Sequence, residues 1–232
     1  AISSKQIEEL QIISLKDNLS VCVDFEYRGV PLFIQTKQIL NEKKLGKIFL
    51  IKLDWLMGSR SDPEREWNWY SLEEKGGGVI GALGTHAIDI LYWFFGEIKN
   101  VNGKIFTSIK ERPEISSGKK YKVTSEDICI ANLDINNFDD GIIPCQISLS
   151  SVSKCGRGFS LEIYGSEGSL FLNSNNQKDY VHGFKLNLFD KSNKLKSISA
   201  ENEFQFEKTW SDGRIAPVKH IHNLWGESIR TV

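Results

Sequence analysis

The apolar segment at residues 79–95 constrains the fold of this chain more than any other part of the sequence. Three consecutive glycines at residues 76–78 precede the segment, and Gly96 closes it. A helix advances by about 100° per residue, and one of its sides here would carry Val79, Leu83, His86, Ile90 and Phe94. The other sides are almost as apolar. We therefore expect a buried helix that other elements of a folded core must cover.

The flanking segments predict those elements. Before the apolar segment we expect helices over 3–16 and 31–44 and strands over 21–27 and 47–57. After it, β-branched and aromatic runs separated by turn residues predict strands over 100–107, 121–134, 142–153, 158–164 and 169–172, with 185–190 and 196–206 as further strands and 216–231 as a last helix. Helices come early and strands come late. We therefore predict an α+β fold with a large, mostly antiparallel open sheet and helices on one face.

The composition excludes several classes of partner. The 232 residues carry a net charge of -1 and contain no basic block, so neither nucleic acid nor an anionic membrane surface is expected as a partner. The apolar runs fall short of the roughly 18–20 residues that span a bilayer, and no secretory signal is visible at the start. The four cysteines form no C-x-x-C pair, which favours reduced thiols and a cytoplasmic location.

His86 lies near the middle of the apolar segment, and two interpretations of it stay open. In the first, it is a core histidine whose ring nitrogens are satisfied by hydrogen bonds, for instance to Asp89 one turn later. In the second, it is a general acid/base at the floor of a cleft, because an imidazole exchanges protons near neutral pH.

A polar and aromatic loop at residues 58–75 is a second candidate region, since long loops inside domains often carry function. Its candidate substrate-binding residues are Arg60, Trp67, Trp69 and Tyr70, whose rings and polar groups suit sugar recognition; the alternative is surface packing with solvated charge. Outside the loop, Arg28 could bind a cofactor phosphate or pair with an acidic side chain. His220 and His222 do not share a helix face, so no metal site is expected.

Several motifs together resemble one known family. Three glycines at residues 76–78 followed by Gly84, His86 and Asp89 match its glycine-histidine-aspartate pattern. The segments VCVDFEYRGVP, LGKIFLIKLDW and SLEIYGSEGSLFL agree with it in order and spacing. These motifs cover nearly the whole chain. On this basis the chain is identified as a member of the Gfo/Idh/MocA (glucose-fructose oxidoreductase, inositol dehydrogenase and rhizopine catabolism) family.

This resemblance implies a two-domain oxidoreductase. Residues 1–27 would be the last helix and strand of a truncated dinucleotide-binding (Rossmann) domain, and residues 28–232 would form the C-terminal substrate and oligomerisation domain. The exposed sheet face would pair with another subunit, giving a homo-oligomer. NAD or NADP would be bound mainly by the upstream domain, and the residues that choose between them would lie there.

Two departures from the family pattern bear on mechanism. The family's catalytic lysine would lie just before Ala1, and its catalytic aspartate, four residues before the histidine, is Ala82 in this chain. A methyl group can neither orient an imidazole nor accept a proton. His86 is thus the one matching catalytic position, and Asp89 is the nearest replacement carboxylate in sequence.

The resemblance therefore predicts a hydride transfer between a nicotinamide cofactor and a CH–OH group of a sugar, a polyol or a related small molecule. The isolated chain is expected to be inactive, because the cofactor site would lie upstream. The alternative is a member of the same family that binds a small molecule or serves assembly without catalysis, which the loss of the aspartate at Ala82 would mark.

Overall fold

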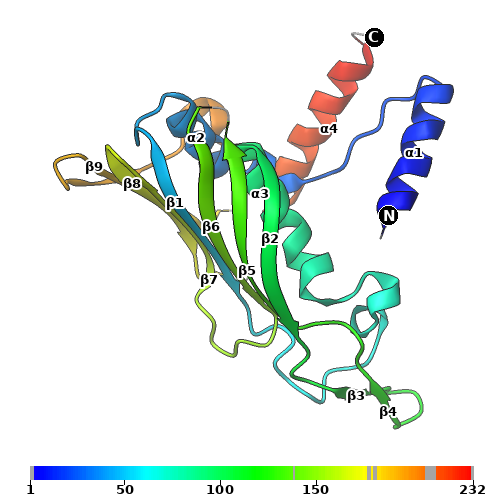
Figure 1. Ribbon diagram of the computed structural model, residues 1–232. Helices are drawn as coiled ribbons and strands as arrows, with labels where there is room; N and C mark the ends of the chain where they lie inside the picture. Colours follow the sequence, from blue (N-terminus) through cyan, green and yellow to red (C-terminus); the bar gives the residue numbers. More distant parts are fainter. Residues whose placement is uncertain (1–2, 138, 177–178, 180–181, 207–212, 231–232) are drawn as a thin grey trace.

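The computed structural model describes residues 3–137, 139–176, 179, 182–206 and 213–230. Its main element is an eight-stranded sheet in the order β10-β9-β8-β7-β1-β6-β5-β2 (Figure 1). The strands are β1 (Ile48–Leu56), β2 (Glu97–Phe106), β5 (Ile128–Asn137), β6 (Gly141–Ser150), β7 (Gly158–Gly165), β8 (Gly168–Ser174), β9 (Lys185–Asp190) and β10 (Leu195–Ile198). Only β1 and β6 run parallel, so the predicted α+β fold with a mostly antiparallel sheet is confirmed.

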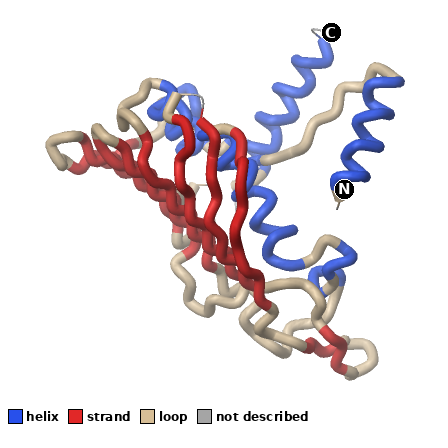
Figure 2. The backbone as a smooth tube through the Cα atoms, in the orientation of Figure 1, coloured by secondary structure: helices blue, strands red, loops and turns tan. Residues whose placement is uncertain are grey.

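Two helices cover one face of this sheet, α2 (Pro31–Asn41) and α3 (Thr85–Phe95) (Figures 1 and 2). A π-helical turn, η4 (Ile80–Gly84), leads directly into α3. Alternation along the strands builds the core beneath the helices: Ile51 and Leu53 of β1 are fully buried, whereas Lys52 between them faces the other side. Phe33 of α2 and Ile90 of α3 are also fully buried. Burial of one such side chain stabilises the folded state by about 1.5–3 kcal/mol.

The apolar segment at residues 79–95 forms the expected helix, but the expectation of all-round burial is only partly correct. Ile80, Ile88 and Tyr92 are 41%, 38% and 57% exposed, so one side of the helix remains uncovered. The longer stretch Glu73–Phe95 is long and apolar enough to cross a membrane, yet half of its apolar window is buried inside the protein. A core helix meets the same criteria, and this helix packs on β5 and β6.

The prediction of one strand over 121–134 is wrong, because the segment is divided. Its first part is β4 (Lys120–Lys122), which pairs with β3 (Glu111–Pro113) in a separate two-stranded sheet. The division falls at Asp127, whose carboxylate accepts hydrogen bonds from the backbone N–H groups of Ser108 and Ile109. The predicted strand over 196–206 is likewise shorter and is followed by a 3₁₀ turn, η5 (Asn202–Phe204).

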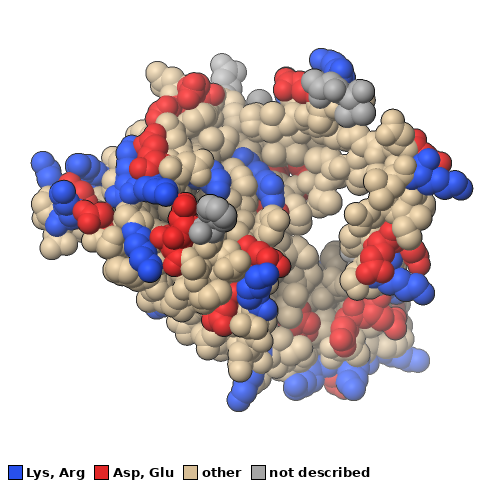
Figure 3. Space-filling model, turned by 45° about the horizontal axis from the view of Figure 1, so that its top comes forward, with Lys and Arg blue, Asp and Glu red and all other residues tan. Residues whose placement is uncertain are grey.

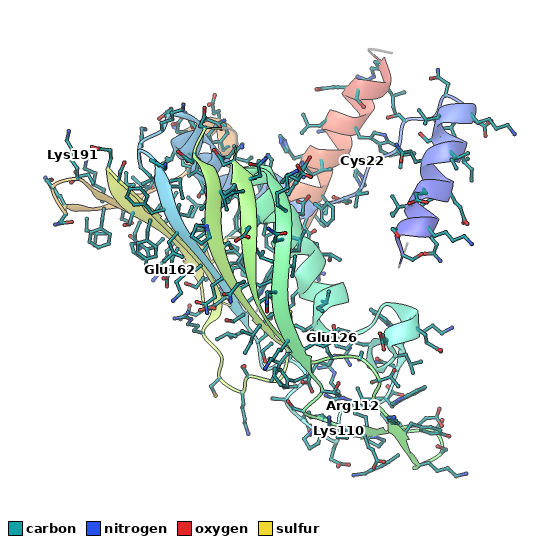
Figure 4. All side chains as sticks on the ribbon, in the orientation of Figure 1. Cys22, Lys110, Arg112, Glu126, Glu162 and Lys191 are labelled. Atoms are coloured by element: carbon teal, nitrogen blue, oxygen red, sulfur yellow. The ribbon has the colours of Figure 1, made fainter. Side chains whose placement is uncertain are left out.

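The N-terminal region contrasts with this core. Helix α1 (Ser4–Lys16) buries no residue, and the next residues run extended to a 3₁₀ turn, η1 (Glu26–Gly29). The predicted strand over 21–27 is therefore wrong: in the described part of the chain it pairs with no other strand, and Val21 and Val23 are exposed. Helix α4 (Ile215–Arg230) packs on η1, and Trp225 donates a hydrogen bond to Ser20 on the extended segment, near Cys22 (Figure 4).

Among the residues that the structure describes, no helix covers the second face of the sheet (Figure 1). Tyr164, Phe171 and Phe189 lie on three adjacent strands of that face, with ring centroids 5.8 and 5.6 Å apart. Tyr164 also donates a hydrogen bond of 2.8 Å to Glu162 beside it. In Figure 3, basic and acidic side chains are interspersed over the visible surface, with no large patch of one sign.

Candidate active site

His86 stands on the first turn of α3 and lies beside aromatic rings from η1, from the residue before η1 and from β1. Its ring makes edge contacts with Phe25 and Tyr27 at centroid distances of 5.8 and 5.4 Å, and lies 6.5 Å from the ring of Trp55. The side chain is 25% exposed, but its Nδ1 atom is buried without a hydrogen-bond partner among the described residues. The imidazole therefore has one buried nitrogen with unmet hydrogen-bonding capacity, and its remaining edges carry the exposed part of the side chain.

The carboxylate that faces this nitrogen belongs to Glu26. Its Oε2 atom lies 3.7 Å from His86 Nδ1, and its side chain is only 15% exposed. Sequence reasoning missed Glu26, because the residue lies in the segment interpreted as a strand and 60 positions from His86. The only signal was an acidic side chain beside Arg28 in the crossing between the two predicted domains.

Asp89 has a different partner. Arg28 binds it through two parallel hydrogen bonds, Nη2 to Oδ1 at 2.6 Å and Nε to Oδ2 at 2.9 Å. The Asp89 side chain is 7% exposed, and the guanidinium lies 5.8 Å from the Trp93 ring centroid. Arg28 thus forms an ion pair with an acidic side chain, which is one of the two roles considered for it from the sequence. Both Asp89 oxygens face Arg28. The catalytic role of Asp89 and the cofactor-binding role of Arg28 stay predictions.

The triple glycine joins three segments tightly at the start of the helix. Gly78 has a φ of 93°, and a side chain there would collide with Glu126. A side chain on Gly77 would collide with the backbone of Tyr70. The buried Glu126 in turn accepts a hydrogen bond of 2.8 Å from the Ile80 backbone N–H through its Oε1 atom, and it lies at the same end of the sheet as Arg112 (Figure 4).

That carboxylate decides whether the glycines could hold a nucleotide. Residues 76–81 match the spacing Gly-x-Gly-x-x-Gly of dinucleotide-binding loops. Such a loop follows a strand and presents free N–H groups at a helix N-terminus to a pyrophosphate. Here the glycines follow a 3₁₀ turn, η3 (Glu73–Lys75), and Glu126 occupies the helix start with a negative charge. The residues present do not fit a cofactor pyrophosphate.

Hydrogen bonds and a ring contact join the loop at residues 58–75 to the two-stranded sheet of β3 and β4. Arg112 of β3 donates hydrogen bonds of 2.6 Å to the backbone carbonyls of Arg60 and Asp62. Trp67 donates one to the carbonyl of Lys122 and packs on Tyr121, while Arg60 lies 3.8 Å above the ring of Tyr70. Burial lowers the pKa of Arg60 and raises that of Tyr70. Three of the four predicted loop residues therefore hold the loop together.

Trp69 is the fourth, and it is 58% exposed. Among the described rings, its ring contacts only that of Tyr70, at a centroid distance of 5.8 Å. In the part of the chain that the structure describes, none of the four loop residues makes a hydrogen bond, ion pair or ring contact with His86. Their substrate-binding role stays a prediction.

No group of three potential metal ligands occurs within the described residues. All four cysteines are free: Cys22 and Cys155 are exposed, and Cys129 and Cys145 are buried. Burial raises the pKa of the Cys145 thiol to about 12, which keeps it protonated and unreactive at neutral pH.

The sequence of this chain is similar to those of known oxidoreductases. Residues 37–229 match a family model described as "Oxidoreductase family, C-terminal alpha/beta domain" (Gfo/Idh/MocA). An uncharacterized oxidoreductase of Synechocystis is 40% identical over 95% of this chain and 59% of its own length. A levoglucosan dehydrogenase of Pseudarthrobacter phenanthrenivorans is 26% identical over 69% of this chain and 44% of its own length.

Solved structures share the fold. An NAD-binding oxidoreductase from Klebsiella pneumoniae superimposes with a TM-score of 0.80 at 20% identity, covering 97% of this chain and 61% of that one. A levoglucosan dehydrogenase in complex with NADH and L-sorbose superimposes with a TM-score of 0.76 at 22% identity, covering 92% of this chain and 58% of that one. The chain thus spans less than two thirds of the length of these relatives.

Proposed function

Because the chain belongs to the Gfo/Idh/MocA oxidoreductase family, whose C-terminal α/β domain it matches over residues 37–229, we propose that its parent protein is an NAD- or NADP-dependent oxidoreductase. It oxidises or reduces a CH–OH group of a sugar, a polyol or a related small molecule. The levoglucosan dehydrogenase among the relatives, with its structure holding NADH and L-sorbose, supports this substrate and cofactor class.

The observation that carries this proposal is the set of contacts around His86. One ring nitrogen is buried opposite a carboxylate, three aromatic rings lie beside the imidazole, and the side chain is 25% exposed. An exposed edge can reach a ligand hydroxyl, while the buried edge faces Glu26. This is the arrangement that a general acid/base requires, because proton transfer depends on a held geometry.

The cofactor cradle belongs, in this proposal, to a dinucleotide-binding domain upstream of residue 28. The acidic start of the glycine helix cannot serve, and apolar side chains such as Val21, Val23 and Tyr92 are 63%, 62% and 57% exposed, as expected where another domain packs. When bound, the nicotinamide supplies the hydride acceptor or donor. The isolated chain would therefore be inactive; nicotinamide-dependent turnover by this polypeptide alone would contradict that.

The open sheet face suits pairing with a second copy of the chain, and we include a homo-oligomer in the proposal. The row of Tyr164, Phe171 and Phe189 offers an apolar surface on a helix-free face. Light scattering on this chain tests it: a dimer or larger species is expected, converted to a monomer by Phe171→Glu, and a strict monomer in both would overturn it. The free cysteines support a cytoplasmic location.

The test of the activity uses the full-length parent protein. Reduction of NAD and NADP is measured with a panel of sugars and polyols, for native protein and for His86→Ala. The variant is expected to lose about 100-fold or more in kcat, the usual contribution of a general acid/base. Turnover that survives His86→Ala would remove His86 from the reaction.

Ala82 favours a second candidate, a family member that binds a small molecule or serves assembly without catalysis. Calorimetry with the same panel separates the two. Ligand binding by the full-length protein without any nicotinamide turnover would support the binding protein, whereas turnover would exclude it.

A further inference from the structure

We propose that Glu26 is the positioning residue for His86, in place of the carboxylate that Ala82 cannot provide. The inference rests on the proposed function for its catalytic meaning. Its structural content, that Glu26 sets the proton on His86 Nδ1, stands on the geometry of this chain alone.

The buried nitrogen of His86 needs a partner. Nδ1 is shielded from solvent and has no hydrogen bond among the described residues, and an unsatisfied buried polar group costs about 1–3 kcal/mol. Glu26 Oε2 is the one carboxylate oxygen of the described residues within 4.0 Å of it, at 3.7 Å. A hydrogen bond requires about 3.2 Å or less, so a movement of about 0.5 Å would form it, as is common when ligand-free sites tighten.

The other carboxylate near His86 is not available. Asp89 lies one turn further along α3, but its Oδ1 and Oδ2 atoms each accept a hydrogen bond from Arg28. The ion pair also neutralises both charges. Glu26 makes no ion pair with a lysine or arginine among the described residues, so its negative charge remains directed at the imidazole.

Neighbouring aromatic rings also restrict the environment of the imidazole. The rings of Phe25 and Tyr27 contact the imidazole edge-on at centroid distances of 5.8 and 5.4 Å, and the tilted ring of Trp55 lies 6.5 Å away. In apolar surroundings, the attraction between an imidazolium and a carboxylate is stronger than in water. Glu26 is therefore suited both to hold the ring and to stabilise it once it is protonated.

The chemical consequence is a defined tautomer. With the proton on Nδ1 directed at Glu26, the lone pair of Nε2 is free to act as the base. When a substrate alcohol is oxidised, its O–H bond would break and an Nε2–H bond would form, and the O–H electron pair would become the second bond of the new C=O group. A nicotinamide held by the parent protein would supply the acceptor for the C–H electron pair. Reduction returns the same proton from Nε2 to the carbonyl oxygen.

The first test needs no cofactor. Nitrogen-15 histidine spectra of this chain at about pH 8, where free imidazole is neutral, report which ring nitrogen carries the proton. We expect the Nδ1–H tautomer for His86, conversion to the Nε2–H tautomer in Glu26→Leu, and retention in Glu26→Gln, whose amide oxygen still accepts. Asp24→Asn is the matched control: Asp24 lies 3.2 Å from His222, so only the His222 signal should change. An unchanged His86 tautomer in Glu26→Leu would overturn the proposal.

The second test asks what the contact does in the full-length protein. Glu26→Leu is expected to lower kcat about 10-fold or more with KM changed less than about 3-fold, and to have no further effect in a His86→Ala background, since residues acting as a unit are not additive. Independent, additive losses would refute a role through His86. If native protein shows no turnover, the proposed function fails, while the tautomer experiment still decides the role of Glu26.

Discussion

The sheet with its covering helices and the N-terminal region before η1 use apolar residues in opposite ways. In the first region, the side chains of Phe33, Ile51 and Ile163 are each 0% exposed, and all three belong to one core. In the second, Ile12, Leu15 and Val21 are 64%, 75% and 63% exposed, although their spacing suits a helix and a strand. An apolar pattern thus establishes an element's preferred form, but only a partner surface makes it part of a core. The pocket of His86 lies where the two regions meet, at η1.

The largest expected difference between the regions is in packing. Phe33 contacts the rings of Tyr27, Phe94, Phe159 and Phe184, so Phe33→Ala should lower the free energy of unfolding of this chain by about 3–5 kcal/mol. Leu15→Ala should change it by less than about 0.5 kcal/mol. Urea unfolding measures both. A loss above 1 kcal/mol for Leu15→Ala would show that α1 packs on the rest of the chain, at odds with the structure.

A smaller effect is expected at the junction itself, where Arg28 of η1 binds Asp89 of α3. Arg28→Ala leaves a carboxylate that is 7% exposed without its partner and should cost about 2–3 kcal/mol. The control is Lys43→Ala, whose ion pair with Asp139 is exposed on both sides and should contribute less than about 1 kcal/mol. Equal losses in the same urea titration would mean that the Arg28–Asp89 pair does not hold η1 to the core.

The reactivity of the cysteine thiols should also differ between the two regions. Cys22 lies exposed on the N-terminal segment, whereas burial in β6 raises the pKa of Cys145 to about 12. We expect iodoacetamide at pH 8 to modify Cys22 within minutes and to leave Cys145 unmodified in the folded chain. Peptide mass spectrometry reads both sites. Rapid labelling of Cys145 would indicate that β6 opens on that timescale.

Much of the fold follows from the sequence because its signals are local. Strands β6 to β9 lie close to their predicted bounds, since alternation and the turn at Gly165–Gly168 depend on neighbouring residues. The errors have non-local causes. The strand expected over 21–27 fails for want of a partner strand, and the one over 121–134 is divided where Asp127 binds the backbone of another segment, 18 and 19 residues away.

The candidate site divides in the same way. His86 could be found from its own surroundings in the sequence, as a histidine in an apolar helix behind three glycines. Its partner could not, because Glu26 reaches it only through the packing of η1 on α3. Asp89, the nearest acid in sequence, turned out to face Arg28 instead. Spacing along a helix identifies which side chains share a face, but not which long-range partner each one meets.

The most direct test of the central claim, that the His86 pocket carries the chemistry, compares two histidines of similar setting in the full-length protein. His182 is 26% exposed and lies 3.3 Å from Asp179, much as His86 is 25% exposed and lies 3.7 Å from Glu26. Nicotinamide-coupled kcat/KM is measured for His86→Ala and His182→Ala on the best substrate. We expect a loss of about 100-fold or more for His86→Ala and little change for His182→Ala; equal effects, or none at His86, would contradict the account.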